Sequence, residues 1–436
     1  MTVIRPNSIS GVTSITAQTN ALNFYDSAGT TLSIGASVTG NITGDVTGNL
    51  TGNVTGDVNA GVITATTITG VSTIGVTTVT ATNLTVNGNA YPTAGPLSNR
   101  NLIINGAMAV AQRGTSSTSG GYQTIDRYST DDSSGTTTKT QESLSSGDPY
   151  DMGFRNFLRL TNTSIVSDTS AGYRNIYQGI EAQNVAQSGW NYTSSSSYIT
   201  LSFWVRSSVS QEYFGSIQTF DGTQQKYPFS TGTLAANTWT KIIKIIPGNT
   251  NVTVNNDNGA GILINISPFW GTNYTDSGVS VDTWASFSGS TRFPDFTSTW
   301  ATTAGATFDI TGVQLEVGEV ATPFEHRSYG DELLRCQRYC QRYTKIAASG
   351  TVASSTATYH PFTFLTEFRS APALTVNTLG NTVKEGTNWY PNTAISLNDP
   401  CPSGTNLNCT QSNNGMVAVD STRLGNGCDL TFTAEL

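Results

Sequence analysis

Five aromatic residues in two polar stretches are the residues of this sequence that best fit a ligand-binding role. The stretches SGWNYTSSSS and SPFWGTNYTDSGVSVDTWASFSG place them among small polar residues; they are Trp190, Tyr192, Trp270, Tyr274 and Trp284. An aromatic ring can stack on the apolar side of a pyranose, while Asn, Asp and Thr groups bond its hydroxyls. We predict a glycan platform at these five, with packing under a loop or against a neighbouring subunit as an equally weighted alternative for each ring. Trp204, inside an apolar strand, and Trp239, just before one, are predicted to be core residues instead.

The sequence offers little for catalysis. It contains no P-loop, G-x-S-x-G, HExxH, GxGxxG or EF-hand pattern, and its two histidines are His326 and His360. Cys336 or Cys340 could pair with His326, but cysteines on an apolar helical stripe are usually packing residues. A glycosidase needs two carboxylates at a defined separation; the acids that could supply such a pair are Glu212, Asp221, Asp276, Asp282, Asp295 and Glu316. We predict no enzyme, no catalytic residue, no cofactor and no metal site, with a polysaccharide depolymerase as an alternative.

Composition limits the partners of the chain. Its 436 residues carry 21 basic and 29 acidic side chains, a formal net charge of −8, and no basic cluster, which argues against nucleic-acid binding. The first residues, MTVIRPNSIS, lack the apolar core of a signal peptide, and no apolar run approaches membrane-spanning length. We therefore expect synthesis in a cytoplasm and no membrane insertion. Five cysteines give an odd count that does not indicate a disulfide framework.

A four-residue repeat between Gly40 and Asn59 predicts a fibre. The phrases GNIT, GDVT, GNLT, GNVT and GDVN follow one another, so that an even period matches the two-residue alternation of a strand. Glycines and aliphatic residues then share one face, which needs partners, and identical chains are the simplest partners. We predict a homotrimeric β shaft over residues 38–96, either of intertwined chains or of three separate small β-helices. A flexible Gly/Thr linker is the alternative.

The rest of the chain divides by pattern. Residues 1–37 are predicted to form a small folded foot, and residues 97–326 an all-β sandwich of jelly-roll type, because short apolar runs alternate with Gly, Asn, Ser and Pro. Residues 327–345 are predicted to hold the one helix, spanning Asp331 to Lys345 with Ser328 or Asp331 as its cap. Its stripe of Leu333, Cys336, Cys340 and Tyr343 could form a trimeric coiled-coil seam or pack on the sandwich. Residues 346–436 are predicted to form a C-terminal β domain.

Several long motifs resemble a family of tailed-phage fibres. They are NLIINGAMAVAQRG from Asn101, YQTIDRY from Tyr122, LSFWVRSS from Leu201 and GVQLEVGEVATPFEHRSYGDELLRCQRY from Gly312. The same order of shaft, carbohydrate-binding-module-like sandwich and CQRY helix is found in such fibres, which are common in marine phages of cyanobacteria. TFLTEFRSAPALTV, from Thr363, resembles the strand that opens their C-terminal domain. Cys340 departs from the residue expected after CQRY.

The resemblance implies a homotrimeric virion fibre, with the N-terminal foot attached to other virion proteins and the distal domains facing the host. We therefore expect a tail fibre or other external fibre subunit that recognises a host cell-surface glycan and mediates adsorption without enzymatic activity. The alternatives are a structural or decoration fibre of head, collar or tail without specific glycan binding, and a depolymerase.

Overall fold

The computed structural model describes residues 84–86, 89–91, 99–346, 348–384, 388–412, 421–424 and 427–436. The chain divides into two units, Met1–Thr77 and Thr78–Leu436, and every described residue belongs to the second. The predicted foot, residues 1–37, lies outside the described residues, as does the predicted shaft, residues 38–96, apart from one strand pair. In that pair β1 (Leu84–Val86) and β2 (Asn89–Tyr91) run antiparallel.

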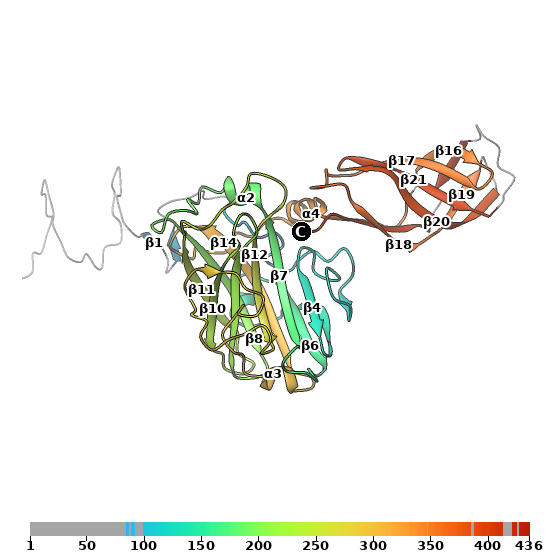
Figure 1. Cartoon of the computed structure of the whole chain (residues 1–436). Coiled ribbons are helices and arrows are strands. Elements are labelled where there is room, and N and C mark those ends of the chain that lie inside the picture. The colour runs from blue at the N-terminus through green and yellow to red at the C-terminus, as the bar shows by residue number, and fades with distance from the viewer. Residues whose placement is uncertain are drawn as a thin grey trace, which may run out of the picture. The chain divides into compact units, whose positions relative to one another are not determined.

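Two six-stranded antiparallel sheets form a β-sandwich, which confirms the predicted all-β, jelly-roll fold class (Figure 1). Sheet I has the order β13-β10-β9-β12-β7-β4, with bounds β4 Ser129–Ser133, β7 Tyr173–Glu181, β9 Glu212–Thr219, β10 Gln225–Thr233, β12 Ala260–Trp270 and β13 Ala285–Ser286. Sheet II has the order β11-β8-β14-β6-β5-β3, with bounds β3 Ser116–Ser117, β5 Thr136–Ser143, β6 Asn156–Ser164, β8 Tyr198–Ser207, β11 Thr240–Pro247 and β14 Thr307–Val317. Three short helices lie in the connections: α1 Asp148–Asp151, α2 Ala182–Ala186 and α3 Thr299–Thr302.

Alternation along the strands separates the core from the outer faces. In β8 the fully buried side chains of the inner face are Ile199, Leu201, Phe203 and Val205. The residues between them, Thr200, Ser202, Trp204 and Arg206, therefore face away from the core. Trp204 is buried as predicted, at 8% exposure, but it packs with Phe154 in a cluster separate from the main core. Trp239 is only half-buried and packs against the same cluster.

The helix is shorter than predicted. α4 spans Tyr329–Gln337, and Ser328 caps it by accepting a hydrogen bond from the Asp331 amide at 3.1 Å. Residues Cys340–Tyr343 form strand β15 instead of continuing the helix, so the predicted stripe of Leu333, Cys336, Cys340 and Tyr343 does not lie on one helix. Cys, Tyr and Thr are modest helix formers, and pairing with β23 (Asp429–Thr433) satisfies the backbone here while burying Cys340 completely. Within the described residues, no helix has the length and apolarity needed to cross a membrane.

The C-terminal β region consists of a small sheet and a barrel. The sheet has the order β15-β23-β18, where β18 is Ala373–Thr378. The closed barrel has the order β16-β17-β21-β20-β19-β22, with bounds β16 Ser349–Ser354, β17 Ala357–Thr363, β19 Asn381–Lys384, β20 Asn388–Cys401, β21 Gly404–Gln411 and β22 Ser421–Leu424. The chain thus leaves the small sheet after β15, builds part of the barrel, returns as β18, completes the barrel and returns as β23.

Buried ion pairs join the small sheet and α4 to the sandwich. The Arg127 guanidinium is fully covered, forms an ion pair with Glu435 and lies 3.5 Å from the centre of the Tyr339 ring. Arg338 donates two hydrogen bonds to Glu181, at 2.7 and 2.8 Å. Burial of Glu181 raises the pKa of its carboxyl group, but the bonds from Arg338 lower this pKa, so that it lies below the ordinary value. Segments more than a hundred residues apart in the sequence are therefore fixed to one another.

Candidate binding site

The five predicted platform residues fall into two groups rather than one surface. Trp190 is 3% exposed and its indole nitrogen donates to the Ser197 carbonyl at 3.2 Å, so its ring is part of the core. Tyr192 is half-buried against Trp190, and Trp284 is half-buried against Tyr227. The turn after β11 links these residues, because Trp284 donates to the Pro247 carbonyl at 2.7 Å and the Asn249 amide donates to the Tyr192 carbonyl at 2.8 Å.

The second group, Trp270 and Tyr274, lies at the end of β12 in a dense aromatic cluster. Trp270 is 6% exposed; Tyr173 stacks on it at 4.8 Å between ring centres, and Arg292 lies 5.0 Å from its centre. Tyr274 is half-buried and meets Trp270 edge-on at 5.1 Å. The buried Trp190 and Trp270 rings therefore present no open face on which a sugar could stack, whereas Tyr192, Tyr274 and Trp284 keep partial exposure.

An aromatic pocket of about 400 Å³ lies instead on the outer face of sheet II. We call it the Trp204 pocket, after one of the residues that line it. Its functional side chains come from β8, β11 and the segments next to α1 and after β14; they are Phe154, Ser202, Trp204, Lys241, Phe324 and His326. Trp204 is the register partner of Lys241 in β11 and of Thr311 in β14. Because register partners share a face, strand pairing itself brings the tryptophan and the lysine together.

Three rings form the aromatic wall of the Trp204 pocket. Phe154 and Phe324 meet edge to face at 4.8 Å, and His326 lies 5.2 Å from Phe154 and 4.9 Å from Phe324. The Met152 carbonyl can only accept, so His326 Nε2 must donate the 2.9 Å hydrogen bond between them. This bond fixes the imidazole as part of the wall, and the aromatic geometry matches the edge-to-face arrangement that ring quadrupoles prefer.

Gly312 makes room for this wall. It lies where the β14–β8 register shifts, between Thr311 and Gln314, and has a φ of +64°. A Cβ at this position would lie 2.7 Å from Phe154 Cζ, closer than real carbon contacts allow. A residue without a side chain is therefore required both by the left-handed backbone and by the ring that crosses it.

A buried carboxylate positions the segment that carries Phe324. Glu316 is 1% exposed and accepts hydrogen bonds from the Thr322 amide at 2.9 Å, the Thr322 hydroxyl at 2.6 Å and Gln314 at 2.9 Å. Arg100 forms an ion pair with it at 3.4 Å. The Glu325 amide donates to the Gln314 side chain at 2.8 Å. This network ties the chain that follows β14 back onto the strand, so the wall is preorganised.

Polar groups around the Trp204 pocket remain free for a ligand. The Trp204 indole nitrogen makes no hydrogen bond within the described residues and is not among their fully enclosed unpaired atoms, so it reaches solvent. Partial enclosure lowers the pKa of Lys241, an effect that Glu316 opposes. The exposed Ile243, the register partner of Ser202, continues an apolar surface along β11. An apolar wall with an N–H donor, a hydroxyl and an ammonium fits a polyhydroxylated ring.

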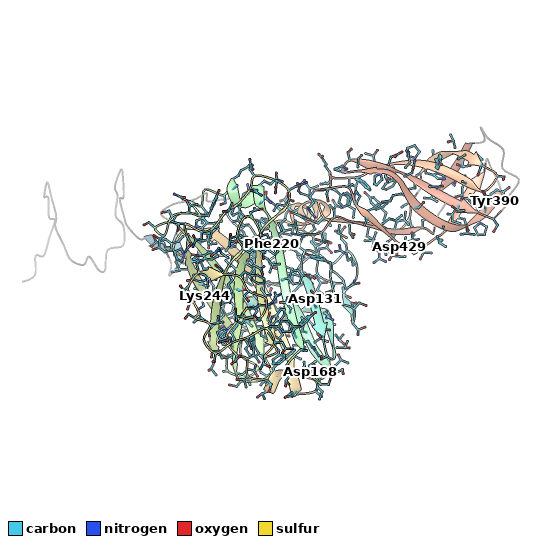
Figure 2. All side chains as sticks on the ribbon, viewed as in Figure 1. Asp131, Asp168, Phe220, Lys244, Tyr390 and Asp429 are labelled. Carbon is cyan, nitrogen blue, oxygen red and sulfur yellow. The ribbon has the colours of Figure 1, made fainter. Side chains whose placement is uncertain are left out.

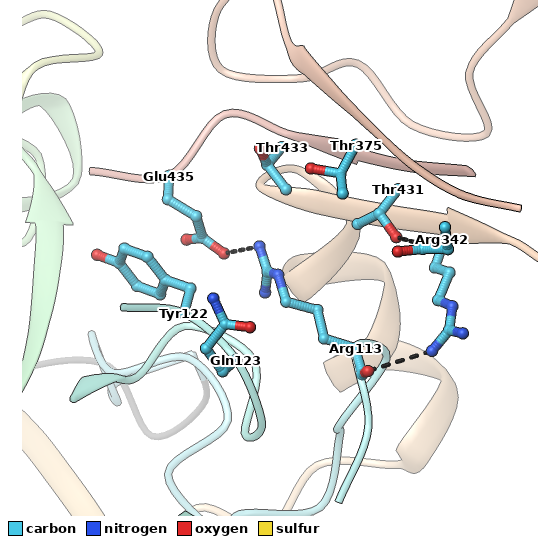
Figure 3. Close-up of a pocket in the computed structure, with 9 residues that line it drawn as sticks. Arg113, Tyr122, Gln123, Arg342, Thr375, Thr431, Thr433 and Glu435 are labelled. Atoms are coloured by element: carbon cyan, nitrogen blue, oxygen red, sulfur yellow. Dashed lines mark hydrogen bonds and ion pairs between the residues drawn. The ribbon is translucent and has the colours of Figure 1, made fainter. Parts of the chain in front are cut away.

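A second hollow, of about 370 Å³, is polar and lies between the small sheet and the loop at Tyr122 (Figure 3). Its charges are already paired: Arg113 donates to Glu435 at 2.8 Å, and Arg342 forms an ion pair with Asp429 at 2.6 Å, a residue labelled in Figure 2. Arg342 also donates to the Arg113 carbonyl at 3.2 Å. Because these bonds consume its cations, we assign this hollow a structural role.

Glu316, the acid whose charge acts on Lys241 of the Trp204 pocket, is buried, and both oxygens of its carboxylate accept hydrogen bonds. Burial raises the pKa of the Cys336 and Cys340 thiols, which disfavours the nucleophilic thiolate. In the part of the chain that the structure describes, no three His, Cys, Asp or Glu side chains gather as metal ligands.

The sequence pattern assigns Trp204 to the core and does not indicate this pocket. The pocket depends on Gly312, on the return of residues 321–326 to β14 and on the contacts of Met152 and Phe154, just after α1, with that segment, none of which a linear pattern encodes. One signal in the sequence could have indicated the pocket: the other residues on the same face of this strand, Thr200, Ser202 and Arg206, are polar.

No protein-family model and no curated protein matches this sequence. Among solved structures, the enzymatically active domain of tailspike protein 4 of bacteriophage CBA120 is 13% identical with a TM-score of 0.28, over 50% of this chain and 21% of that chain. TmCBM61 in complex with β-1,4-galactotriose is 8% identical with a TM-score of 0.21, over 50% of this chain and 98% of that chain. The N-terminal CBM22-1-CBM22-2 tandem domain of Paenibacillus barcinonensis Xyn10C is 11% identical with a TM-score of 0.21, over 75% of this chain and 99% of that chain. Likenesses this weak indicate neither a shared ligand nor a shared activity.

Proposed function

We propose that this protein is a virion fibre subunit of a tailed phage that binds a host-surface glycan, without cleaving it, through the Trp204 pocket. The observation that carries glycan binding is the pocket itself: a preorganised aromatic wall beside an unpaired indole N–H and a lysine. The fibre role is supported by the four-residue repeat from Gly40 and by the sequence resemblance to phage fibres. In this proposal the subunit is a homotrimer, its N-terminal region attaches to other virion proteins, and it resides on the outside of the virion.

Weak single sites suit such a fibre. One sugar ring buries little surface, but several sites on one trimer and several trimers on one particle raise the overall avidity without any new contact. A rigid pocket on a β-sandwich then serves attachment better than a mobile one, because less ordering entropy is lost on binding.

A glycan array probed with the full-length protein tests the ligand assignment. Trp204→Ala and Phe324→Ala should each weaken binding about tenfold or more, corresponding to about 1.4 kcal/mol, because each removes a ring from the pocket. Tyr359→Ala is the matched control, since Tyr359 is 40% exposed and lies in the barrel. Glycan binding that survives both pocket variants would refute the site. The mass of the full chain in solution, by light scattering, should be that of a trimer; a monomer would refute the fibre assembly.

A further inference from the structure

One buried cation of the sandwich lacks the counter-charge that the others have. In the described part of the chain the fully covered basic residues Arg127, Lys139 and Arg174 each lie within 4 Å of a carboxylate, with pair distances of 2.5 Å for Lys139 and 3.9 Å for Arg174. Lys226 on β10 is only 4% exposed, yet it donates no hydrogen bond and forms no ion pair among the described residues. Its ammonium is not one of the fully enclosed unpaired atoms, so a solute can reach it. Because this ammonium is reachable and no acid contacts it, an anionic group of a ligand could supply the negative charge that the protein does not.

A second cation faces the same place. Lys226 is the register partner of Ala285 in β13, so Phe287, two residues further along, belongs to the same face. The Arg292 guanidinium carbon lies 5.0 Å from the centre of the Phe287 ring and 5.0 Å from that of Trp270. Arg292 donates to the Gly289 carbonyl at 3.2 Å, and no described carboxylate forms an ion pair with it. Two basic side chains therefore converge over sheet I, held by aromatic rings rather than by acids.

The pKa shifts agree with two cations that no acid contacts, while burial raises the pKa of the Tyr173 phenol and Asp131 and Asp132 lie close enough to raise it further. Burial lowers the pKa of Lys226, and the neighbouring Arg292 lowers it further, while Asp276 raises it. Burial also lowers the pKa of Arg292, and the nearby phenols of Tyr274 and Tyr173 oppose this shift. Asp276 is exposed and accepts a hydrogen bond from the Gly278 amide at 2.7 Å. Its carboxylate thus remains a distant neighbour of Lys226 and does not neutralise the pair by contact.

Hydroxyl donors complete the site. Tyr173 and Tyr274 meet edge to face at 5.8 Å beside Trp270, and neither phenol makes a hydrogen bond within the described residues. Both side chains keep partial exposure. A ligand would find two positive charges, two phenol donors and the open edge of Tyr274 in one place. Charge-assisted hydrogen bonds of this kind favour an oxyanion over a neutral hydroxyl.

We propose that Lys226, Arg292, Tyr173 and Tyr274 form a second saccharide subsite that binds the carboxylate or sulfate group of an acidic sugar. This inference rests on the proposed glycan-binding function, and it specifies the charge class of the glycan. It also places part of the recognition on sheet I, whereas the Trp204 pocket lies on sheet II. Two of the residues predicted from the sequence then contribute to this subsite. Trp270 supports the Arg292 guanidinium, and the Tyr274 phenol donates a hydrogen bond to the ligand.

Calorimetric titration of the full-length protein at constant ionic strength tests the subsite. The probes are D-glucuronate, inorganic sulfate, acetate and neutral D-glucose. We expect saturable binding of glucuronate, tighter than that of acetate or glucose, and a loss of at least tenfold in Lys226→Met and in Arg292→Gln. Lys345→Met, which removes an exposed charge far along the sequence, should bind as the unmodified protein does. Trp270 fluorescence should change on glucuronate binding, because Arg292 lies over its ring.

Two results would overturn the subsite: glucuronate and sulfate that both bind no more tightly than acetate, or binding that both variants retain. Its failure is distinguishable from failure of the Trp204 pocket. Array binding of acidic glycans that is lost in Trp204→Ala but unchanged in Lys226→Met would leave the proposed function intact and refute the acidic-sugar subsite. Binding lost in Lys226→Met but retained in Trp204→Ala would refute the Trp204 pocket and leave the acidic-sugar subsite intact.

Discussion

Substitution of Gly312 by alanine should damage both the stability of the sandwich and the aromatic wall of the Trp204 pocket. Two separate effects act at this position. The φ of +64° is unfavourable for any residue with a Cβ, and the added methyl would lie 2.7 Å from Phe154 Cζ and 3.1 Å from two further ring carbons. Phe154 is 2% exposed and cannot move outward without disturbing Phe324 and His326.

The magnitude follows from the sum of these effects. A left-handed conformation costs about 1–2 kcal/mol for an L residue. Overpacking a tight site costs a further 1–3 kcal/mol, roughly. We therefore expect Gly312→Ala to reduce the free energy of unfolding by about 2–5 kcal/mol, and to weaken glycan binding because the Phe154 ring is displaced.

Two other glycines separate the effects experimentally. Gly305 has a φ of +74°, and no atom lies within 4 Å of the place that a Cβ would take, so Gly305→Ala reports the backbone strain alone. Gly289 has open space and no positive φ, so Gly289→Ala should change the free energy of unfolding by less than about 0.5 kcal/mol. Denaturant unfolding followed by tryptophan fluorescence gives all three values. If Gly312→Ala destabilises no more than Gly305→Ala, then contact with Phe154 does not shape the pocket and the argument fails.

Two further predictions concern titratable groups. Burial raises the pKa of Asp126 to about 6 from 3.8, so the folded protein binds this proton more tightly than the unfolded chain, and its contribution to stability falls as pH rises from about 4 to about 6. Denaturant unfolding across this range should show that the stability of the unmodified protein, relative to that of Asp126→Asn, falls with rising pH; a constant difference would contradict the assignment. Among the five free thiols Cys401 is exposed, and its hydrogen bond with Ser403 lowers its pKa, whereas burial raises the pKa of Cys409 and Cys428. Mass spectrometry after brief alkylation of the native protein should find one fast site, absent in Cys401→Ser, and equal labelling of a buried thiol would refute this ordering.

The sandwich could be predicted from the sequence because its strands obey the two-residue period. In LSFWVRSS the inner residues Leu201, Phe203 and Val205 are aliphatic or aromatic, and all three are fully buried in the structure. The helix prediction was right at its start, where Ser328 caps the first turn by a local contact. It was wrong after Gln337, because the pairing of Cys340–Tyr343 with Asp429–Thr433 depends on residues about ninety positions away. Local propensity cannot anticipate such a partner.

The binding residues were harder to predict for a physical reason. An aromatic residue in a polar loop can point outward or fill the space beneath the loop, and its neighbours in sequence do not distinguish the two. Trp190 fills space, with its N–H bonded to its own loop, and Trp270 supports other side chains. Apolar neighbours in sequence predict that Trp204 is a core residue. Its side chain is instead on the outer face of the sheet, where it lines a pocket together with Phe154 and Phe324. Whether such a residue lines a pocket depends on how segments far apart in the sequence pack, here residues 152–154, the β8–β11 strand pair and residues 321–326.

The position of β23 has a consequence for how the chain is made. β23 is the central strand of the sheet β15-β23-β18, although it follows both neighbours in the sequence. During synthesis β15 and β18 therefore have no partner in this sheet until residues 429–433 have emerged from the ribosome. Any chain interrupted before Asp429 would carry two unpaired strand edges and would lack Glu435, the acid that neutralises the buried Arg127. Chains that lack β23 would then be recognisable to proteases and chaperones, because they expose unpaired strand edges and an uncompensated buried cation.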